Sequence, residues 1–193
     1  PRSRADFAVG VMGLGVLGQI VVQAARASGA TVIGIDPDPA RRAMAAILGV
    51  HHTLASPAAD AIKDMTGGKG ADICIEVSGA APALADAIRS VAYASRVVAM
   101  GFYQGEIAGL RLGDEFHHNR IELISSQISG VAPAASHRWS KPRLWRTAVQ
   151  LQHDRMLDLL PLITHTAPFQ EAPTLFEQLD AGAPGMLQTM LVF

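Results

Sequence analysis

The sequence predicts an α/β fold in which helices cover both faces of a doubly wound parallel sheet. Short apolar segments alternate with longer segments whose apolar residues repeat at helical spacing, and the connections between them are short. The apolar segments are hydrophobic at nearly every position, which is typical of parallel strands covered on both faces. This pattern holds from Phe7 to Ile128, so we expect the sheet to occupy that part of the chain.

Five segments are predicted to be strands of this sheet. Each is short and rich in Val, Ile, Leu or Met, and residues that favour turns or helix ends lie beside it. Such segments fit strands that are buried between two layers of helices. They are Phe7–Met12, Thr31–Ile35, Asp72–Val77, Ser95–Met100 and Ile121–Ile128.

The first two predicted helices follow the first two strands. In the second of these helices, Asp38 is the expected N-cap, Pro39 is the first helical residue, and the helix runs to Leu48. The first helix, Val16–Ser28, ends at Gly29 and places four apolar residues on one face, which are Leu17, Ile20, Val21 and Ala24.

Two further helices are predicted by the same signals. Ser56-Pro57 is expected to open the third helix, and Thr66-Gly67-Gly68 ends it. Pro82–Val91 is expected to be the fourth helix, because apolar residues line one side of it, namely Leu84, Ile88 and Val91.

Beyond Gly130 the alternation of strands and helices stops. Ala132–Pro142 is expected to form a loop, and basic residues cluster around two tryptophans from Arg138 to Arg146. The elements expected after this loop are a helix at Leu144–Leu160, an amphipathic helix at Ala172–Ala181 and a terminal strand at Met186–Phe193. We therefore predict two domains, residues 1–160 and residues 161–193.

Composition excludes several classes of function. A formal net charge of −1 leaves no basic field for nucleic acid. Phe7–Ala25 carries no charge, but its spaced glycines and two glutamines indicate a buried strand, turn and helix rather than a membrane span or signal peptide. Cys74, the single cysteine, rules out an internal disulfide, fits a cytoplasmic protein, and is expected in the core because isoleucine stands on both sides of it.

A glycine-rich segment follows the first strand and opens the first helix. Its sequence is Gly13-Leu14-Gly15-Val16-Leu17-Gly18. In this context the pattern predicts a dinucleotide site on a Rossmann fold. Gly13 permits the tight turn, Gly15 lets backbone amides approach the pyrophosphate, and Gly18 lets helix and strand pack closely. The pyrophosphate is expected at the positive end of the helix.

Asp36 ends the second strand eighteen residues after Gly18, close to the spacing of about 20 that is typical of the ribose-binding acid. Its carboxylate is expected to accept hydrogen bonds from the ribose hydroxyls and to repel the 2′-phosphate of NADP, so NAD is favoured. The alternative is a turn or capping role before Pro37. NADP also stays open, because Arg41 or Arg42 could stabilise a phosphate.

Other polar residues do not form a catalytic or metal-binding pattern. Glu76 is interpreted as a hydrogen-bonded structural acid rather than a direct cofactor ligand. The pairs His51-His52 and His117-His118 have no cysteine partners and are expected to be solvated loop residues. We predict no catalytic residue and no metal ligand in this chain.

The order of motifs resembles the medium-chain dehydrogenase/reductase superfamily, most closely its zinc-containing alcohol dehydrogenase branch. The motifs are the segment ending at Gly18, Gly-Ile-Asp36, Leu-Gly49, Thr-Gly-Gly-Lys-Gly-Ala-Asp72, Ile-Glu-Val-Ser-Gly79 and Val-Val-Ala-Met-Gly101. The resemblance implies that Asp36 holds the adenosine ribose with Arg41 beside it. It also implies that the nicotinamide half is lined by Val77, Ser78, Met100, Gly101 and Phe102.

The resemblance further implies a catalytic domain before the cofactor domain, which supplies zinc and the substrate pocket. We expect this chain, which begins at Pro1, to be a part that lacks that domain and is inactive alone. Residues 161–193 would normally return to it. Val131–Arg146 lies outside the shared pattern and is interpreted as a surface insertion, with a role in substrate choice or assembly as the alternative.

The expected function is hydride transfer between an alcohol or polyol substrate and NAD. The alternatives are a zinc-independent quinone or enoyl reductase of the same superfamily, and a non-catalytic NAD-sensing module. No nucleic acid or membrane partner is expected. We expect a homodimer, because Ile121–Ile128 should be an open sheet edge, and because the resemblance implies dimerisation there. The terminal strand is the competing surface.

Overall fold

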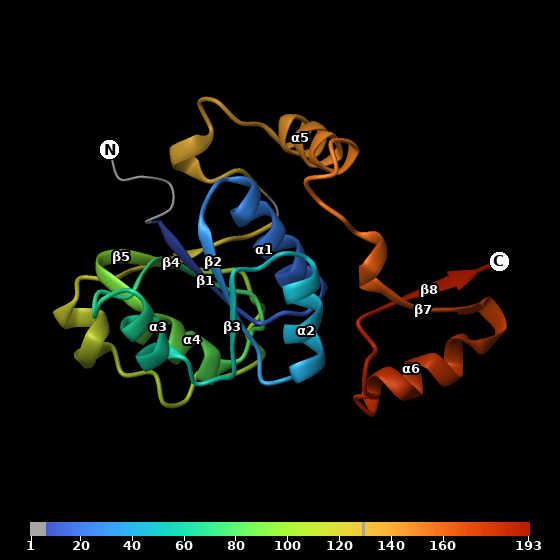
Figure 1. The fold of residues 1–193 in the computed structure, drawn as a ribbon, viewed down its shortest axis with the longest axis horizontal. Helices are drawn as coiled ribbons and strands as arrows, with labels where there is room; N and C mark the ends of the chain where they lie inside the picture. Colours follow the sequence, from blue (N-terminus) through green and yellow to red (C-terminus); the bar gives the residue numbers. More distant parts are fainter. Residues whose placement is uncertain (1–6, 129) are drawn as a thin grey trace. The chain divides into compact units, whose positions relative to one another are not determined.

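The computed structural model describes residues 7–128 and 130–193, and the chain divides into two units (Figure 1). The first unit ends at Leu157 and the second is Asp158–Phe193. Within the described residues the first unit contains a six-stranded sheet in the order β3-β2-β1-β4-β5-β6, with all neighbours parallel. This topology confirms the predicted doubly wound sheet. Its strands are β1 (Ala8–Met12), β2 (Thr31–Ile35), β3 (His52–Leu54), β4 (Ala71–Glu76), β5 (Val91–Ala99) and β6 (Glu122–Ser125).

Four helices cover the two faces of this sheet (Figure 1). Helices α1 (Val16–Ala27) and α2 (Pro39–Ile47) lie on one face. Helices α3 (Ala59–Met65) and α4 (Ala81–Ser90) lie on the other. The helices change face where the chain passes from β3 to β4. From β1 the chain continues to β2 and β3 on one side of the sheet, and from β4 it continues to β5 and β6 on the other side.

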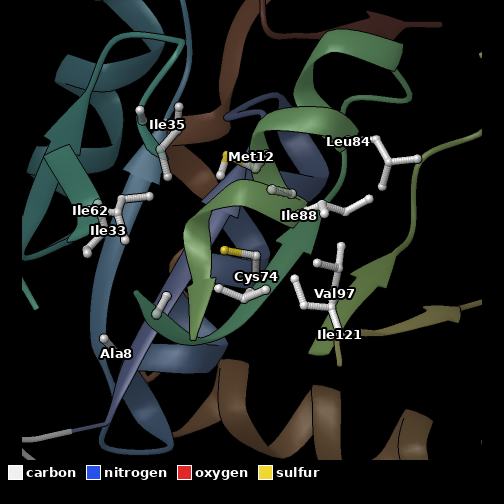
Figure 2. Packing of buried hydrophobic residues seen from close by; sticks show 14 residues of the cluster. Ala8, Met12, Ile33, Ile35, Ile62, Cys74, Leu84, Ile88, Val97 and Ile121 are labelled. Carbon is white, nitrogen blue, oxygen red and sulfur yellow. The ribbon is translucent and has the colours of Figure 1, made fainter. Parts of the chain in front are cut away.

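Alternate residues of each central strand face opposite cores, which explains why the strands are apolar at nearly every position. Met12, Ile33 and Ile35 join Ile62, Leu84 and Ile88 in one core (Figure 2). Val9, Val11 and Val32 join Val22 and Ala45 in the other. Cys74 lies fully buried in the first core, as predicted, and burial raises the pKa of its thiol well above the usual range.

Helix α1 buries a different face from the one that its apolar residues predict. A Cβ atom on Gly18 would lie 1.9 Å from the carbonyl oxygen of Gly13, so only glycine allows this approach. The side of the helix that carries Gly18 and Val22 therefore faces the sheet. Leu17 is 58% exposed, and the buried residues of the helix are Gly18, Gln19, Val22 and Gln23.

The uncharged stretch Phe7–Ala25 is divided between β1, the glycine-rich turn and α1, as the glycines predict. A turn interrupts the apolar run after Met12, and the helix that follows is only twelve residues long. Among the helices of residues 7–128 and 130–193, none has the length and hydropathy that a membrane crossing requires.

Strand β3 is not predicted by the sequence pattern. Three residues are too few to show a periodicity, and the segment is marked only by two histidines. His52 belongs to this strand and pairs with Ile33 rather than lying in a loop. His51 is exposed, yet its Nδ1 accepts a hydrogen bond of 3.0 Å from the N–H of Val32.

Helix α3 begins at Ala59 and not at Ser56-Pro57. The N–H groups of Ala58 and Ala59 donate to the carboxylate of Asp86 at 2.7 and 3.1 Å. Asp86 is buried and belongs to α4, so the cap of α3 comes from a neighbouring helix instead of from the local sequence.

The later elements of the first unit also differ from prediction at their ends. β5 begins at Val91, directly after α4, whereas the predicted strand starts at Ser95. β6 stops at Ser125, because the strand that pairs with it ends at Ala99. Helix α5 (Lys141–His153) starts inside the predicted loop, where Ser140 Oγ accepts from the N–H of Arg143, and it ends well before Leu160. Shorter helical turns lie at Leu112–Phe116 and Pro133–Ala135 in this unit, and at Leu160–Leu162 and Phe169–Glu171 in the second unit.

The second unit consists of one β-α-β element. β7 (Ile163–Pro168) and β8 (Gln188–Val192) are parallel neighbours, and α6 (Ala172–Asp180) connects them. α6 lies where an amphipathic helix is predicted, and β8 is the predicted terminal strand in shortened form. The rings of Phe169 and Phe193 stack with centroids 4.7 Å apart.

Replacing Asp86 with alanine is expected to lower the free energy of unfolding by about 2–3 kcal/mol, because two buried amides lose a charged acceptor. Chemical denaturation followed by circular dichroism measures the change. Asp60→Ala on α3 is the control, because that side chain is 85% exposed and its loss should change the stability by less than about 0.5 kcal/mol. Equal losses in the two variants would contradict the capping role.

Candidate functional site

The residues predicted to bind a dinucleotide gather at one edge of the sheet. They follow the carboxyl ends of β1, β2, β4 and β5, and in a parallel sheet these ends lie on the same side. β1 and β4 are neighbours whose crossovers run in opposite directions. Ligands of open α/β sheets bind outside the strands at such a reversal point.

The first and third glycines of the turn after β1 are required by the chain itself. Gly13 has a positive φ of 94°, and a Cβ atom there would lie 2.9 Å from the backbone nitrogen of Ser78. Its N–H donates to the carbonyl of Ile35 at 2.8 Å. Gly18 must be glycine because of its contact with the carbonyl of Gly13. Turn geometry and packing therefore account for both positions.

The second glycine has no such explanation within the described chain. Gly15 has an ordinary extended backbone, with φ −66° and ψ −170°, and a Cβ atom there would meet no atom within 4 Å. Gly15 is the N-cap of α1, no side chain caps the helix, and no acidic residue lies in its first turn. The start of α1 is thus the positive end of a helix without a capping side chain among the described residues, and it lies beside the open space at Gly15, an arrangement that suits an anion.

Asp36 lies beside this turn and is 3% exposed. One carboxylate oxygen accepts from the N–H of Leu14 at 2.7 Å, and the other from the N–H of Asp38 at 2.8 Å. The turn role that was the alternative for Asp36 is therefore present in the structure. Each oxygen retains a further lone pair, so these bonds leave capacity to accept from hydroxyl groups.

The two arginines on α2 have different surroundings. A guanidinium nitrogen of Arg41 lies 3.8 Å from the carboxylate of Asp36 and another lies 3.6 Å from that of Asp38, and the side chain is 44% exposed. Arg42 donates to the carbonyls of Asp36 and Pro37 at 2.6 and 2.9 Å. Arg41 is therefore the cation nearer to the Asp36 carboxylate, while Arg42 stabilises the backbone of the turn.

Gln19 is a site residue that the sequence analysis missed. It is fully buried, and its Nε2 donates to the carbonyls of Leu14 and Arg41 at 3.0 and 2.9 Å. The side chain thereby joins the glycine-rich turn to α2. Its Oε1 is buried without a hydrogen-bond partner among the described residues. A polar residue directly after the third glycine, on a largely apolar helix, was the available signal.

The loops after β4 and β5 lie against each other. A Cβ atom on Gly101 would lie 2.3 Å from the nitrogen of Gly79, and one on Gly79 would lie 2.6 Å from the carbonyl oxygen of Phe102. The N–H groups of Met100 and Gly101 donate to the carbonyl of Glu76 at 2.8 and 3.1 Å. The structure thus brings together the residues predicted to line the nicotinamide, which are Val77, Ser78, Met100, Gly101 and Phe102.

Glu76 is the buried acid between these loops, which fits its interpretation as a structural residue. Its carboxylate accepts from the N–H of Ser78 at 2.7 Å, from the N–H of Gly79 at 3.2 Å and from the Ser78 hydroxyl. The hydroxyl of Tyr103 donates to its other oxygen. Tyr103 was also missed, because its partner lies 27 positions away in the sequence.

The described residues do not fit zinc, which the family resemblance implies for the intact enzyme. Within residues 7–128 and 130–193, no three His, Cys, Asp or Glu side chains gather closely enough to hold a metal ion. Cys74 is fully buried, and the raised pKa of its thiol disfavours the thiolate form that zinc requires.

A cavity of about 990 Å³ lies at the opposite, amino-terminal edge of the sheet. Ala8, Thr31, Asp72 and Val91, at or near the strand beginnings, belong to its wall. None of the predicted dinucleotide-binding residues lines it. Because ligands of this architecture bind at the carboxyl ends of the strands, we place the candidate site at the glycine-rich turn and not in this cavity.

Comparisons with known proteins identify the family of this chain. A family model described as zinc-binding dehydrogenase matches residues 16–148, a range that includes Asp36, the loops after β4 and β5, and the segment 131–146. D-guloside 3-dehydrogenase of Escherichia coli (strain K12) is 35% identical over 177 residues, which are 90% of this chain and 50% of that protein. L-threonine 3-dehydrogenase of Pyrococcus horikoshii is 32% identical over 186 residues, or 94% of this chain and 50% of that protein. The chain therefore spans about half the length of these curated relatives.

Solved structures share the fold. Alcohol dehydrogenase TADH from Thermus sp. ATN1 has a TM-score of 0.77 at 24% identity, over 98% of this chain and 51% of that one. L-idonate 5-dehydrogenase from Escherichia coli has a TM-score of 0.78 at 20% identity, over 100% of this chain and 51% of that one. The resemblance to the medium-chain dehydrogenase/reductase superfamily is thus confirmed, and the chain belongs to the zinc-binding dehydrogenase family.

Proposed function

We propose that this chain binds a nicotinamide dinucleotide, with NAD(H) preferred over NADP(H), and forms the cofactor-binding part of an oxidoreductase for alcohol or polyol substrates. The observation that carries the proposal is the open space at Gly15. The chain requires glycine at positions 13 and 18 for its own packing, but at Gly15 the vacant space lies before the uncapped start of α1. A pyrophosphate group fits that combination of space and unpaired amides.

The remaining residues of the site complete the proposal. The amides of Val16, Leu17 and Gly18 would bind the pyrophosphate. Asp36, with Arg41 beside it, would accept from the ribose hydroxyls. The loops containing Val77 and Ser78, and Met100 to Phe102, would orient the nicotinamide. When bound, the nicotinamide supplies the carbon that accepts or releases hydride.

The substrate class rests on the relatives. D-guloside 3-dehydrogenase and L-threonine 3-dehydrogenase are each named for oxidation at a hydroxyl-bearing carbon of a polar substrate. Both names support a dehydrogenase over a quinone or enoyl reductase or an NAD-sensing module. The substrate pocket, zinc and activity are proposed for the part of the protein that corresponds to the other half of these relatives.

Residues 161–193 are proposed to pack on that catalytic part. A two-stranded sheet alone is marginally stable, and parallel strands are normally covered on both faces. In the second unit Phe176, Met190, Val192 and Phe193 are nevertheless exposed by 45% or more. Their cover is therefore expected from residues outside this unit.

A cytoplasmic homodimer completes the proposal. The location is supported by the single cysteine, Cys74, which is free and buried, as is usual in a reducing compartment. The dimer is supported by β6, which is the last strand of the sheet and has an open edge. Leu123 and Ile124 on this strand are 39% and 38% exposed, and Ile128 beyond it is 92% exposed.

Gly15→Ala is expected to weaken NADH binding roughly tenfold or more, about 1.4 kcal/mol, because the new methyl group would occupy the pyrophosphate position. The free energy of unfolding should stay within about 1 kcal/mol of wild type, since the backbone of Gly15 suits alanine. Isothermal titration calorimetry and chemical denaturation measure the two effects. Gly18→Ala is the contrasting variant and should lose about 1–3 kcal/mol of stability through its clash with Gly13. Unchanged NADH affinity in folded Gly15→Ala would refute this site.

Asp36→Ala is expected to reduce NADH affinity by on the order of 2–4 kcal/mol, because two hydrogen bonds to a charged acceptor are lost. NADPH is the internal control. Its affinity should fall less, or rise, because the variant also removes the negative charge that opposes the 2′-phosphate. The variant also removes the acceptor of the Leu14 N–H, and any resulting damage to the glycine-rich turn would lower the affinity for both ligands together. If NADH affinity is unchanged, the ribose assignment is wrong.

Leu123→Pro is expected to convert the dimer to a monomer, as measured by light scattering. The N–H of Ser126 donates to the carbonyl of Ala99 on β5. Because N–H groups alternate in direction along a strand, the N–H of Leu123 faces the open edge. Proline there removes an outward donor without breaking the β5–β6 pairing. Leu123→Ala, which keeps the donor, should remain dimeric, and circular dichroism checks that both variants are folded. A folded Leu123→Pro dimer would move the interface elsewhere, with the terminal strand as the next candidate.

A further inference from the structure

One buried carboxylate joins the two loops at the end of β4 and β5. Glu76 has no exposed surface. Its Oε1 accepts from both the N–H and the hydroxyl of Ser78 on the loop after β4. Its Oε2 accepts from the hydroxyl of Tyr103 on the loop after β5. The two loops are therefore held by the same side chain, in addition to the close contact between Gly79 and Gly101.

Tyr103 is the side-chain anchor of the second loop. The N–H groups of Met100 and Gly101 are fixed by the carbonyl of Glu76. The segment that follows, residues 102–107, by contrast belongs to no helix or strand. The Tyr103 ring packs against the core that contains Met12 and Ile35, while its hydroxyl reaches Glu76. Phe102, the preceding residue, is 83% exposed.

We infer that Tyr103 is a positioning residue for the nicotinamide half of the cofactor, acting through Glu76. The inference rests on the proposed dinucleotide binding and adds a residue to it. Tyr103 need not touch the cofactor. It holds the segment Met100–Phe102 at a set distance from Val77 and Ser78, so that the two loops present one preformed surface. Preformed surfaces bind more tightly because less conformational entropy is lost on binding.

The protonation state of the pair suits this role. Burial, together with the hydrogen bond and the negative charge of Glu76, raises the pKa of the Tyr103 hydroxyl well above its usual range. The hydroxyl therefore remains protonated at neutral pH and able to donate to the Glu76 oxygen. Because a charged acceptor strengthens a hydrogen bond, removal of this one hydroxyl is expected to have a measurable effect.

Two ligands separate positioning of the nicotinamide from general damage to the site. NADH carries the nicotinamide, whereas ADP-ribose carries the adenosine, both phosphates and the second ribose without it. In the full 193-residue chain, Tyr103→Phe is expected to weaken NADH binding at least fivefold and ADP-ribose binding less than twofold. Tyr93→Phe is the matched control: it removes a hydroxyl from a tyrosine that is 62% exposed, in the first part of β5, away from the site. It should leave both affinities unchanged.

A second measurement needs no variant at Tyr103. With tyrosine labelled by ¹³C at the hydroxyl-bearing carbon, the Tyr103 resonance should shift on addition of NADH and stay in place with ADP-ribose. Tyr93→Phe assigns the resonance, because the chain has two tyrosines. This measurement tests the positioning role of Tyr103 even if Tyr103→Phe does not fold.

The outcomes distinguish failure of dinucleotide binding from failure of the positioning role of Tyr103. Failure of both ligands to bind the wild-type chain overturns the proposed function, and the inference with it. If both ligands bind and Tyr103→Phe weakens them equally or not at all, dinucleotide binding stands and the positioning role is refuted. A Tyr103 resonance that ignores NADH, or that moves equally with ADP-ribose, refutes it as well.

Discussion

The close approach of helix α1 to the turn before it determines the geometry of the candidate site. Gly18 sits so near the carbonyl of Gly13 that any side chain would collide with it. This contact sets the rotation of the helix, which buries Val22 against the sheet and turns Leu17 outward although leucine is the more hydrophobic. The same contact holds the uncapped start of α1 next to the turn after β1, beside the open space at Gly15.

Two buried acids, Asp36 and Glu76, hold the loops of the site from within. Each lies at the end of a strand that neighbours β1, and each accepts hydrogen bonds from backbone amides of an adjoining loop. Burying a carboxylate is costly unless its oxygens are well satisfied, and here the donors are mainly amides and hydroxyls. The acids therefore stiffen the glycine-rich turn and the loops after β4 and β5 before any ligand arrives.

Local patterns predict most of the fold, and two of the failures, the cap of α3 and the role of Tyr103, share one cause. The central strands, the order of helices and the three glycines follow from periodicity and short spacing, so a single sequence reveals them. The cap of α3 comes from Asp86, 28 positions from Ala58, and Tyr103 finds Glu76 27 positions away. Such pairings depend on which elements become neighbours in space. β3 fails differently, because three residues cannot display a period.

The structural acids also bear on how specificity arises in this site. Asp36 is proposed to choose between NADH and NADPH, yet its two oxygens already secure the glycine-rich turn and the start of α2. In the proposed site, recognition of the ribose and the shape of the pyrophosphate position therefore depend on the same carboxylate. Gln19, which joins Leu14 to Arg41, adds a second connection between these two regions. A substitution that alters cofactor preference without loosening the turn has to preserve these contacts, so changes at the exposed Arg41 are structurally easier than changes at Asp36.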